Sequence, residues 1–319
     1  MATSTSSNST TVRSKTALRL TRAVLQAAYV LSEDLGGSIA ERLFTSPRRH
    51  ARPARERAVL AAGQPFEVQV ALRSPRWRGQ STRVTAWRWG IGPTVLLVHG
   101  WEGRGSQLGA LVEPLLAAGL SVVTFDAPGH GDSPGSRLYL TDLADAVIDV
   151  AAAAGPLHAI VAHSFGAAAT LLAHERGGLD VARNVMLAPN VLLAEAFGTF
   201  AHIVGLDDDA RTQLEASITE ATGVPVPSLE ALVGPRDAGL LVIHDQDDRE
   251  VPLVHGERLT AAWAGARLVT TTGLGHRRIL RDPAVLDAVV AEVAAGLPRP
   301  SSDLVREVDK LVAAASTPA

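Results

Sequence analysis

The chain has 319 residues, of which 46% are hydrophobic and 20% are charged, as in globular proteins and unlike disordered or fibrous ones. No apolar run approaches the roughly 20 residues of a membrane span, and a formal net charge of -3 gives no sign of nucleic-acid binding. The chain contains no cysteine, which excludes a cysteine nucleophile, thiolate metal sites and disulfides.

The first 62 residues differ in pattern from the rest, and we interpret them as an N-terminal extension. Residues 1–12 are rich in Ser and Thr and predict a flexible tail. Apolar periodicity over 16–44 predicts one or two amphipathic helices, which we favour over a signal or transit peptide. The arginine-rich stretch 46–57 predicts an exposed connector, which we favour over a patch for an anionic surface.

Short apolar runs recur from about residue 65 and predict strands. The runs 66–72 and 83–89 alternate apolar and polar residues, which predicts an antiparallel hairpin at a sheet edge. The later runs are continuously apolar, as in parallel strands that are covered on both faces. They are 94–100, 121–127, 159–164, 184–189, 239–245 and 266–271.

Segments with helical periodicity lie between these strands, and the alternation predicts an α/β fold with a mostly parallel sheet flanked by helices. The segments are 106–118, 141–154, 165–176, 254–264 and 282–295. About 50 residues separate Pro189 from Gly239, with helical periodicity over 191–203 and 210–222. Because ligands bind beyond the carboxyl ends of such strands, we interpret this insertion, about 190–238, as a small helical lid. We expect one core over 63–299, and a C-terminal helix and tail over 300–319.

The strongest chemical signal is the stretch AIVAHSFGAAAT, residues 159–170. A buried strand runs into a tight turn with Ser164 at its centre and then into an alanine-rich helix. Such a turn presents the serine hydroxyl at the top of the sheet, beside a helix N-terminus that favours developing negative charge. We therefore predict that Ser164 is a nucleophile.

A second loop, after the strand that ends at His99-Gly100, can direct backbone N–H groups at an oxyanion. We expect the donors to be the N–H groups of Trp101 and Phe165, with the Trp101 ring free to form a pocket wall. His99 is better explained as a brace for this loop than as a catalyst, and Glu102 as a solvated carboxylate.

Serine needs an imidazole to accept its proton, and that imidazole needs a buried carboxylate to orient it. His276 lies in a glycine-flanked loop after the last predicted strand, so we assign it this role. The acid belongs to the cluster that ends strand 239–245, where four candidates are Asp245, Asp247, Asp248 and Glu250.

The ordered combination of these motifs, over roughly residues 65–298, resembles the α/β-hydrolase fold superfamily, in its esterase/lipase-like group. The turn SVVTFDAPGHGDSPG, residues 121–135, is also similar to an architectural turn of these enzymes. Ala162 departs from the usual first glycine of the serine motif. The resemblance to a His-Gly-x-x-Asp-x-x-Val-Pro pattern implies that Asp248 is the acid, although Asp245 stands where related enzymes have glycine.

The resemblance implies a serine hydrolase that forms an acyl-enzyme, and we expect a carboxylic ester as its small-molecule substrate. The alternatives are an acyltransferase or thioesterase on the same triad, or a lyase or binding protein of this fold. We expect substrate contacts from Trp101, His163, Phe197 and Phe200. We expect no cofactor, no metal, no nucleic-acid partner and a cytoplasmic location; the natural substrate and the oligomeric state stay open.

Overall fold

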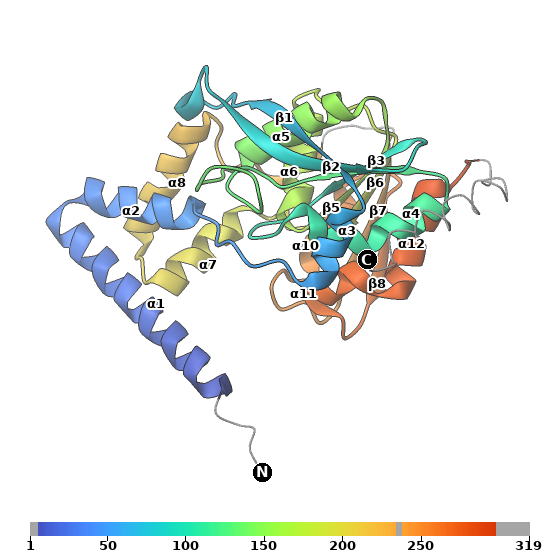
Figure 1. Cartoon of the computed structure of the whole chain (residues 1–319). Coiled ribbons are helices and arrows are strands. Elements are labelled where there is room, and N and C mark those ends of the chain that lie inside the picture. Colours follow the sequence, from blue (N-terminus) through green and yellow to red (C-terminus); the bar gives the residue numbers. More distant parts are fainter. Residues whose placement is uncertain (1–5, 234–237, 298–319) are drawn as a thin grey trace, which may run out of the picture. The chain divides into compact units, whose positions relative to one another are not determined.

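The computed structural model describes residues 6–233 and 238–297, and its centre is an eight-stranded sheet (Figure 1). The strands lie in the order β1-β2-β4-β3-β5-β6-β7-β8. Their bounds are Gln64–Ala71 for β1, Ser81–Trp89 for β2, Thr94–Val98 for β3, Ser121–Phe125 for β4, Leu157–His163 for β5, Arg183–Leu187 for β6, Gly239–Asp245 for β7 and Arg267–Thr271 for β8.

Only β2 runs against its neighbours in this sheet. It pairs antiparallel with β1, Val68 opposite Val84, and antiparallel with β4. The pairs from β4 through β3, β5, β6 and β7 to β8 are parallel. The predicted edge hairpin and the mostly parallel α/β sheet are therefore confirmed.

The burial of each strand follows its place in the sheet. All five residues of β3 and of β4 are buried, as their continuous apolar sequences predicted. β8 differs from that prediction, because it is an edge strand and Val269 is exposed. The carboxyl ends of β5, β7 and β8 point to one edge of the sheet, where the turns after them carry Ser164, Asp248 and His276.

Helices and short turns connect these strands (Figure 1). Among the described helices, none combines the length and hydropathy that crossing a membrane requires. The segment predicted as one helix over 106–118 is a 3-10 turn, Gly105–Leu111, followed by α4, Val112–Ala117. The other helices here are α3 (Ala54–Ala61), α5 (Leu140–Ala154), α6 (Phe165–Glu175), α9 (Leu229–Val233), α10 (Val254–Ala262), α11 (Gly275–Arg278) and α12 (Pro283–Ala294), with 3-10 turns at Pro75–Trp77 and Ile279–Arg281.

The chain divides into two compact units, residues 47–191 with 228–319, the sheet unit, and residues 1–46 with 192–227, the helical unit. The helical unit contains α1 (Ser6–Leu31), α2 (Glu33–Thr45), α7 (Ala194–Val204) and α8 (Asp208–Thr222). Leu25, Ala40, Phe197, Val204 and Leu214 form its buried centre. The N-terminal helices and the insertion thus share one apolar core.

The start of α1 also departs from the sequence prediction. α1 begins at Ser6, ten residues before the predicted start at Thr16. Serine and threonine lower helix propensity only modestly, so a helix can continue through a stretch without apolar periodicity. The predicted C-terminal helix within 300–319 lies outside the described residues.

Candidate active site

Ser164 occupies the strand-to-helix turn between β5 and α6, with the unusual backbone angles φ 55° and ψ -125°. A non-glycine residue with positive φ costs about 1–3 kcal/mol and persists where its surroundings hold it. Here the Ser164 N–H donates to the Leu187 carbonyl at 3.0 Å, and its own carbonyl accepts from Asn190 N–H at 3.1 Å. The chain therefore stabilises a strained turn that holds the Ser164 hydroxyl within hydrogen-bond distance of His276.

Two glycines allow the backbone to pass close to this turn. A Cβ on Gly166 would lie 2.5 Å from the His99 carbonyl oxygen, so α6 can approach β3 only without a side chain there. A Cβ on Gly100 would lie 2.7 Å from Cβ of Ser164. The loop after β3 thus lies directly against the serine.

The side chains of Ser164, His276 and Asp248 form a continuous hydrogen-bonded series. His276 Nε2 lies 2.9 Å from Ser164 Oγ, and His276 Nδ1 lies 2.7 Å from Asp248 Oδ2. All three residues are buried. Because a carboxylate can only accept, Nδ1 carries the proton and Nε2 is left to accept the hydroxyl proton of Ser164.

The Asp248 carboxylate is held by several further groups. Its Oδ1 accepts from the N–H of Glu250 at 2.8 Å and of Val251 at 2.9 Å, and the His244 ring lies 3.6 Å from its Oδ2. Burial by itself raises the pKa of this carboxyl, but the neighbouring His244 and the hydrogen bonds from His276 and Val251 outweigh it. The pKa of Asp248 is therefore held well below its usual range, so an ionised carboxylate lies against the His276 imidazole.

The other acids of this loop have different partners. Asp245 Oδ2 accepts from Leu274 N–H at 2.9 Å and from Thr271 Oγ1 at 2.7 Å, while Oδ1 accepts from Asp247 N–H at 3.0 Å. Asp247 is exposed, but its Oδ2 accepts from Gly273 N–H at 2.9 Å instead of pointing freely into solvent. Glu250 pairs with Arg277 at 2.9 and 3.0 Å. Of the four candidate acids, Asp248 is the one hydrogen-bonded to the imidazole of His276.

His163, predicted to contact substrate, packs against the ring of His276. Its Nε2 donates to the His276 carbonyl at 3.0 Å, and the two rings lie 4.6 Å apart between centroids. Burial, with the His276 ring nearby, lowers the pKa of His163 to about 3, so its ring is neutral. The contact supports the main chain of His276, and a contact with substrate stays a prediction.

The loop after β3 is braced as the sequence predicted. His99 Nδ1 donates to the Gly100 carbonyl at 2.8 Å, and Nε2 accepts from Ala127 N–H at 2.9 Å. The Trp101 ring meets the Phe165 ring edge to face, with centroids 6.1 Å apart. Phe165 begins α6, and the first N–H groups of a helix have no acceptor within the helix. The two residues predicted as oxyanion donors are therefore neighbours beside Ser164.

Comparison with known proteins agrees with this fold. Residues 95–289 match the alpha/beta hydrolase family. The chain belongs to that family. It is 31% identical over 246 residues to an uncharacterized protein of Mycobacterium tuberculosis. The match covers 73% of this chain and 78% of that protein.

A second relative of this alpha/beta hydrolase is a monoacylglycerol lipase of Mycolicibacterium smegmatis, 27% identical over 194 residues. That match covers 57% of this chain and 62% of the relative, less than two thirds of its length. Among solved structures, a thermophilic esterase of Thermogutta terrifontis superposes with a TM-score of 0.52 at 15% identity, over 76% of this chain and 99% of that one. At that identity the likeness shows the fold alone.

The arginine-rich segment 46–57 of this hydrolase forms ion pairs with other parts of the chain, unlike the exposed connector that was predicted. Arg48 and Arg49 are exposed, but Arg48 Nε donates to Glu102 at 2.8 Å, so Glu102 is not simply solvated as predicted. Arg52 binds both Asp126 and Asp132, and buried Glu56 pairs with Arg104 at 2.6 Å. The sequence did not predict these ion pairs, because their partners lie 48 to 80 residues apart in the chain.

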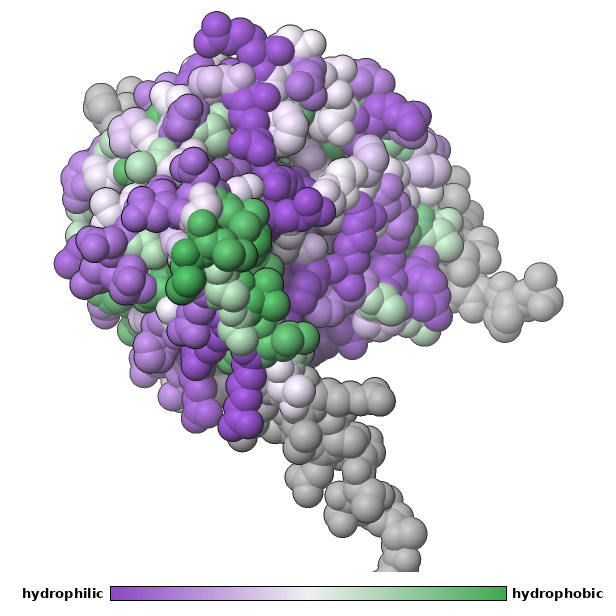
Figure 2. Space-filling model, turned by 90° about the vertical axis from the view of Figure 1, so that its left-hand side faces the viewer, coloured by the Kyte–Doolittle hydropathy of each residue, from purple (hydrophilic) through white to green (hydrophobic). Residues whose placement is uncertain are grey.

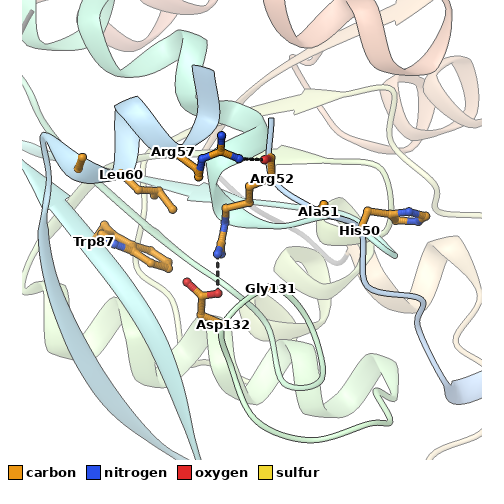
Figure 3. A pocket seen from close by; sticks show the side chains of 9 residues that line it. His50, Ala51, Arg52, Arg57, Leu60, Trp87, Gly131 and Asp132 are labelled. Carbon is orange, nitrogen blue, oxygen red and sulfur yellow. Dashed lines mark hydrogen bonds and ion pairs between the residues drawn. The ribbon is translucent and has the colours of Figure 1, made fainter. Parts of the chain in front are cut away.

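A cavity of about 570 Å³ lies beside this segment (Figure 3). Its lining does not include Ser164, His276 or Asp248, and consists of His50, Ala51, Arg52, Arg57, Leu60, Ala61, Trp87, Gly131 and Asp132. Arg52 points at Asp132, and Arg57 Nη1 donates to the Arg52 carbonyl (Figure 3). Its charged groups therefore already pair with the chain itself.

Phe197 and Phe200, the other predicted substrate contacts, belong to α7 of the helical unit. The Phe197 ring stacks on Phe44 at 4.7 Å, and the Phe200 ring meets Phe44 edge to face at 5.1 Å. Asp207 is the N-cap of α8 and accepts from Ala210 N–H at 2.9 Å. The two phenylalanines therefore build the apolar core of their own unit, and their contact with substrate stays a prediction.

Proposed function

We propose that this alpha/beta hydrolase is a serine hydrolase that cleaves carboxylic esters. Ser164 is the nucleophile, His276 the general base and then the general acid, and Asp248 the group that orients His276. The observation that carries the proposal is the unbroken series from Ser164 Oγ to His276 Nε2, at 2.9 Å, and from His276 Nδ1 to Asp248, at 2.7 Å.

In the first half-reaction, Ser164 Oγ attacks the ester carbonyl carbon while His276 Nε2 accepts its proton. The imidazolium that forms is stabilised by the ionised Asp248, whose lowered pKa keeps it charged. His276 then gives the proton to the departing alcohol, and the acyl group stays bound to Ser164. In the second half-reaction, His276 takes a proton from water, whose oxygen attacks the acyl carbonyl carbon. The bond from that carbon to Ser164 Oγ then breaks, His276 returns the proton to Ser164, and the carboxylic acid leaves.

The negative charge on the carbonyl oxygen needs donors that are in place before the reaction. We assign this role to the N–H groups of Trp101 and Phe165. Supporting observations are the contact between their rings and the close approach of Gly100 to Ser164. The N-terminus of α6 adds a favourable dipole at the same place.

The likeness to a monoacylglycerol lipase supports an ester as the substrate. The Trp101 ring, half-buried beside Ser164, is our candidate for a wall of the acyl pocket. An acyltransferase would use the same residues and differ only in the group that attacks the acyl-enzyme.

The test is hydrolysis of chromogenic esters of increasing acyl length, with and without an added alcohol or thiol. We expect release of the alcohol product by the natural chain and a loss of roughly 10⁴-fold or more in kcat for Ser164→Ala. Faster alcohol release with an added acceptor, together with a new ester or thioester, would instead identify an acyltransferase. The same ester turnover in both proteins would contradict the proposal.

A further inference from the structure

The exposed face of α1 carries a line of aliphatic side chains. Leu20, Val24, Ala27 and Leu31, which we call the apolar stripe, recur at spacings of four, three and four residues and so share one side of the helix. Leu20 is 65% exposed, Val24 51% and Leu31 78%. Exposed aliphatic residues are ordinary singly, but a contiguous row of them marks an interaction surface.

The opposite side of α1 is already used inside the helical unit. Leu25 and Ala28 are buried, and Arg22 donates from Nε to the Ile203 carbonyl of α7 at 2.8 Å. The helix is therefore apolar on two sides. One side packs inside the helical unit, and the other, the apolar stripe, is exposed. Figure 2 shows hydrophobic residues gathered on the surface, with hydrophilic residues around them.

The end of the stripe is the most exposed part. Val30, next to Leu31, is 87% exposed, and α2 begins two residues later after the N-cap Ser32. Two bulky aliphatic side chains thus project where the chain turns between two helices. A corner of this kind can enter an apolar phase without moving the packed face of α1.

The charges of residues 1–32 indicate what kind of surface α1 binds. Residues 1–32 contain four basic residues, Arg13, Lys15, Arg19 and Arg22, and no acid. The first acids, Glu33 and Asp34, lie in the first turn of α2, beyond the stripe. Two copies of α1 brought together along the stripe would therefore concentrate positive charge, with no acid in either helix to offset it. An anionic surface would instead attract the basic residues.

We propose that α1 docks this protein on an anionic lipid bilayer, with the apolar stripe at the boundary between headgroups and acyl chains. Helices that lie in a membrane interface combine such a stripe with Lys and Arg side chains near it. The inference does not rest on the proposed ester hydrolysis, since none of its residues belongs to the site around Ser164.

The test is sedimentation of the full chain with vesicles of phosphatidylcholine alone and of phosphatidylcholine mixed equally with phosphatidylglycerol. We expect binding to the anionic vesicles that weakens as salt is added. The variant Leu20→Ser/Val24→Ser/Leu31→Ser should bind roughly tenfold more weakly or worse, because burial of three aliphatic side chains is lost. The variant Arg13→Gln/Lys15→Gln/Arg19→Gln should lose the preference for anionic vesicles.

Ile91→Ser is the matched control, because Ile91 is 92% exposed, lies in the sheet unit and should not alter binding. Circular dichroism and labelling of Ser164 by a phosphonate probe should be the same in every variant. Absence of vesicle binding by the natural chain would overturn the proposal, as would full binding by the stripe variant or equal binding to both vesicle types. A lipid-free dimer that the stripe variant abolishes would also overturn it and assign the stripe to a second copy of the chain.

Discussion

Asp245 Oδ2 accepts a hydrogen bond from the Leu274 N–H, two residues before His276 in the chain. The same oxygen accepts from Thr271 Oγ1, and Asp247 Oδ2 accepts from Gly273 N–H. The end of β7 and the loop after it therefore bind the end of β8 and the loop after it at these three points, in addition to the contacts of Asp248 with His276 and of Glu250 with Arg277. Asp245, which stands where the resemblance implies a glycine, is thus a carboxylate that binds the loop of His276.

Asp245→Asn should disturb the position of His276 without removing a catalytic group. The amide nitrogen of asparagine cannot accept the N–H groups that the carboxylate binds, so we expect a loss of stability of about 1.5–3 kcal/mol. We expect kcat to fall roughly tenfold or more with little change in KM, because misplacement of the base acts on the chemical step. Glu250→Gln on the same loop is the control, and an equal fall in kcat there would contradict the account.

Asp248→Asn and Asp247→Asn separate the two neighbouring acids by kinetics. Asparagine at 248 should set the wrong tautomer of His276 and lower kcat by roughly 10³ to 10⁴-fold. Asparagine at 247 should change kcat by no more than a few fold, because that side chain is exposed and contacts only the loop backbone. Steady-state kinetics of both purified variants gives the order, and the reverse order would move the acid to Asp247.

The lowered pKa values of three buried histidines predict how the free energy of unfolding depends on pH. Burial lowers the pKa of His99 to about 4, and of His130 and His163 to about 3, against 6.5 for an ordinary histidine. Between pH 6.5 and about 4, the unfolded chain binds protons at these positions and the folded chain does not. The free energy of unfolding should therefore fall as the pH drops, by up to roughly 1.4 kcal/mol per pH unit for each histidine.

Urea unfolding at pH 7 and pH 5 measures this dependence. His130→Gln should reduce this pH dependence, because glutamine does not titrate. The fold should be kept, because glutamine can still accept from Glu102 N–H and donate to the Pro128 carbonyl, as His130 does. His202→Gln, at an exposed position, should leave the dependence unchanged. Equal pH dependence in the natural chain and in His130→Gln would show that His130 does not contribute.

Phe197 and Phe200 test whether the helical unit selects the acyl group. Phe197→Ala should cost about 3–5 kcal/mol of stability, because its ring is buried against Phe44. Phe200→Ala, half-buried, should cost less and is the better probe of substrate choice. We expect its preference among esters of different acyl length to shift while Ser164 stays reactive; Phe66→Ala in β1 is the control. An unchanged preference would assign Phe200 to packing alone.

The sequence predicted the parts of this fold that depend on local patterns. Alternation and continuous apolar runs identified all eight strands. The tight turn around Ser164 and the glycine-flanked loop of His276 marked where β5 and β8 end. It did not predict that Phe197 packs on Phe44, or that Arg52 binds Asp126, since these pairs are distant in sequence and no local pattern connects them. It also could not show that Asp245 binds Leu274, because that depends on the register between β7 and β8.

Labelling of Ser164 by an organophosphonate probe tests the central claim most directly. We predict that intact-mass measurement of the natural chain shows one added probe group, that peptide mapping places it on Ser164, and that Ser164→Ala takes up none. His276→Gln should fold normally and label far more slowly, because the serine then lacks its base. Unmodified natural protein at saturating probe, with its fold intact, would contradict the assignment of Ser164 as the nucleophile.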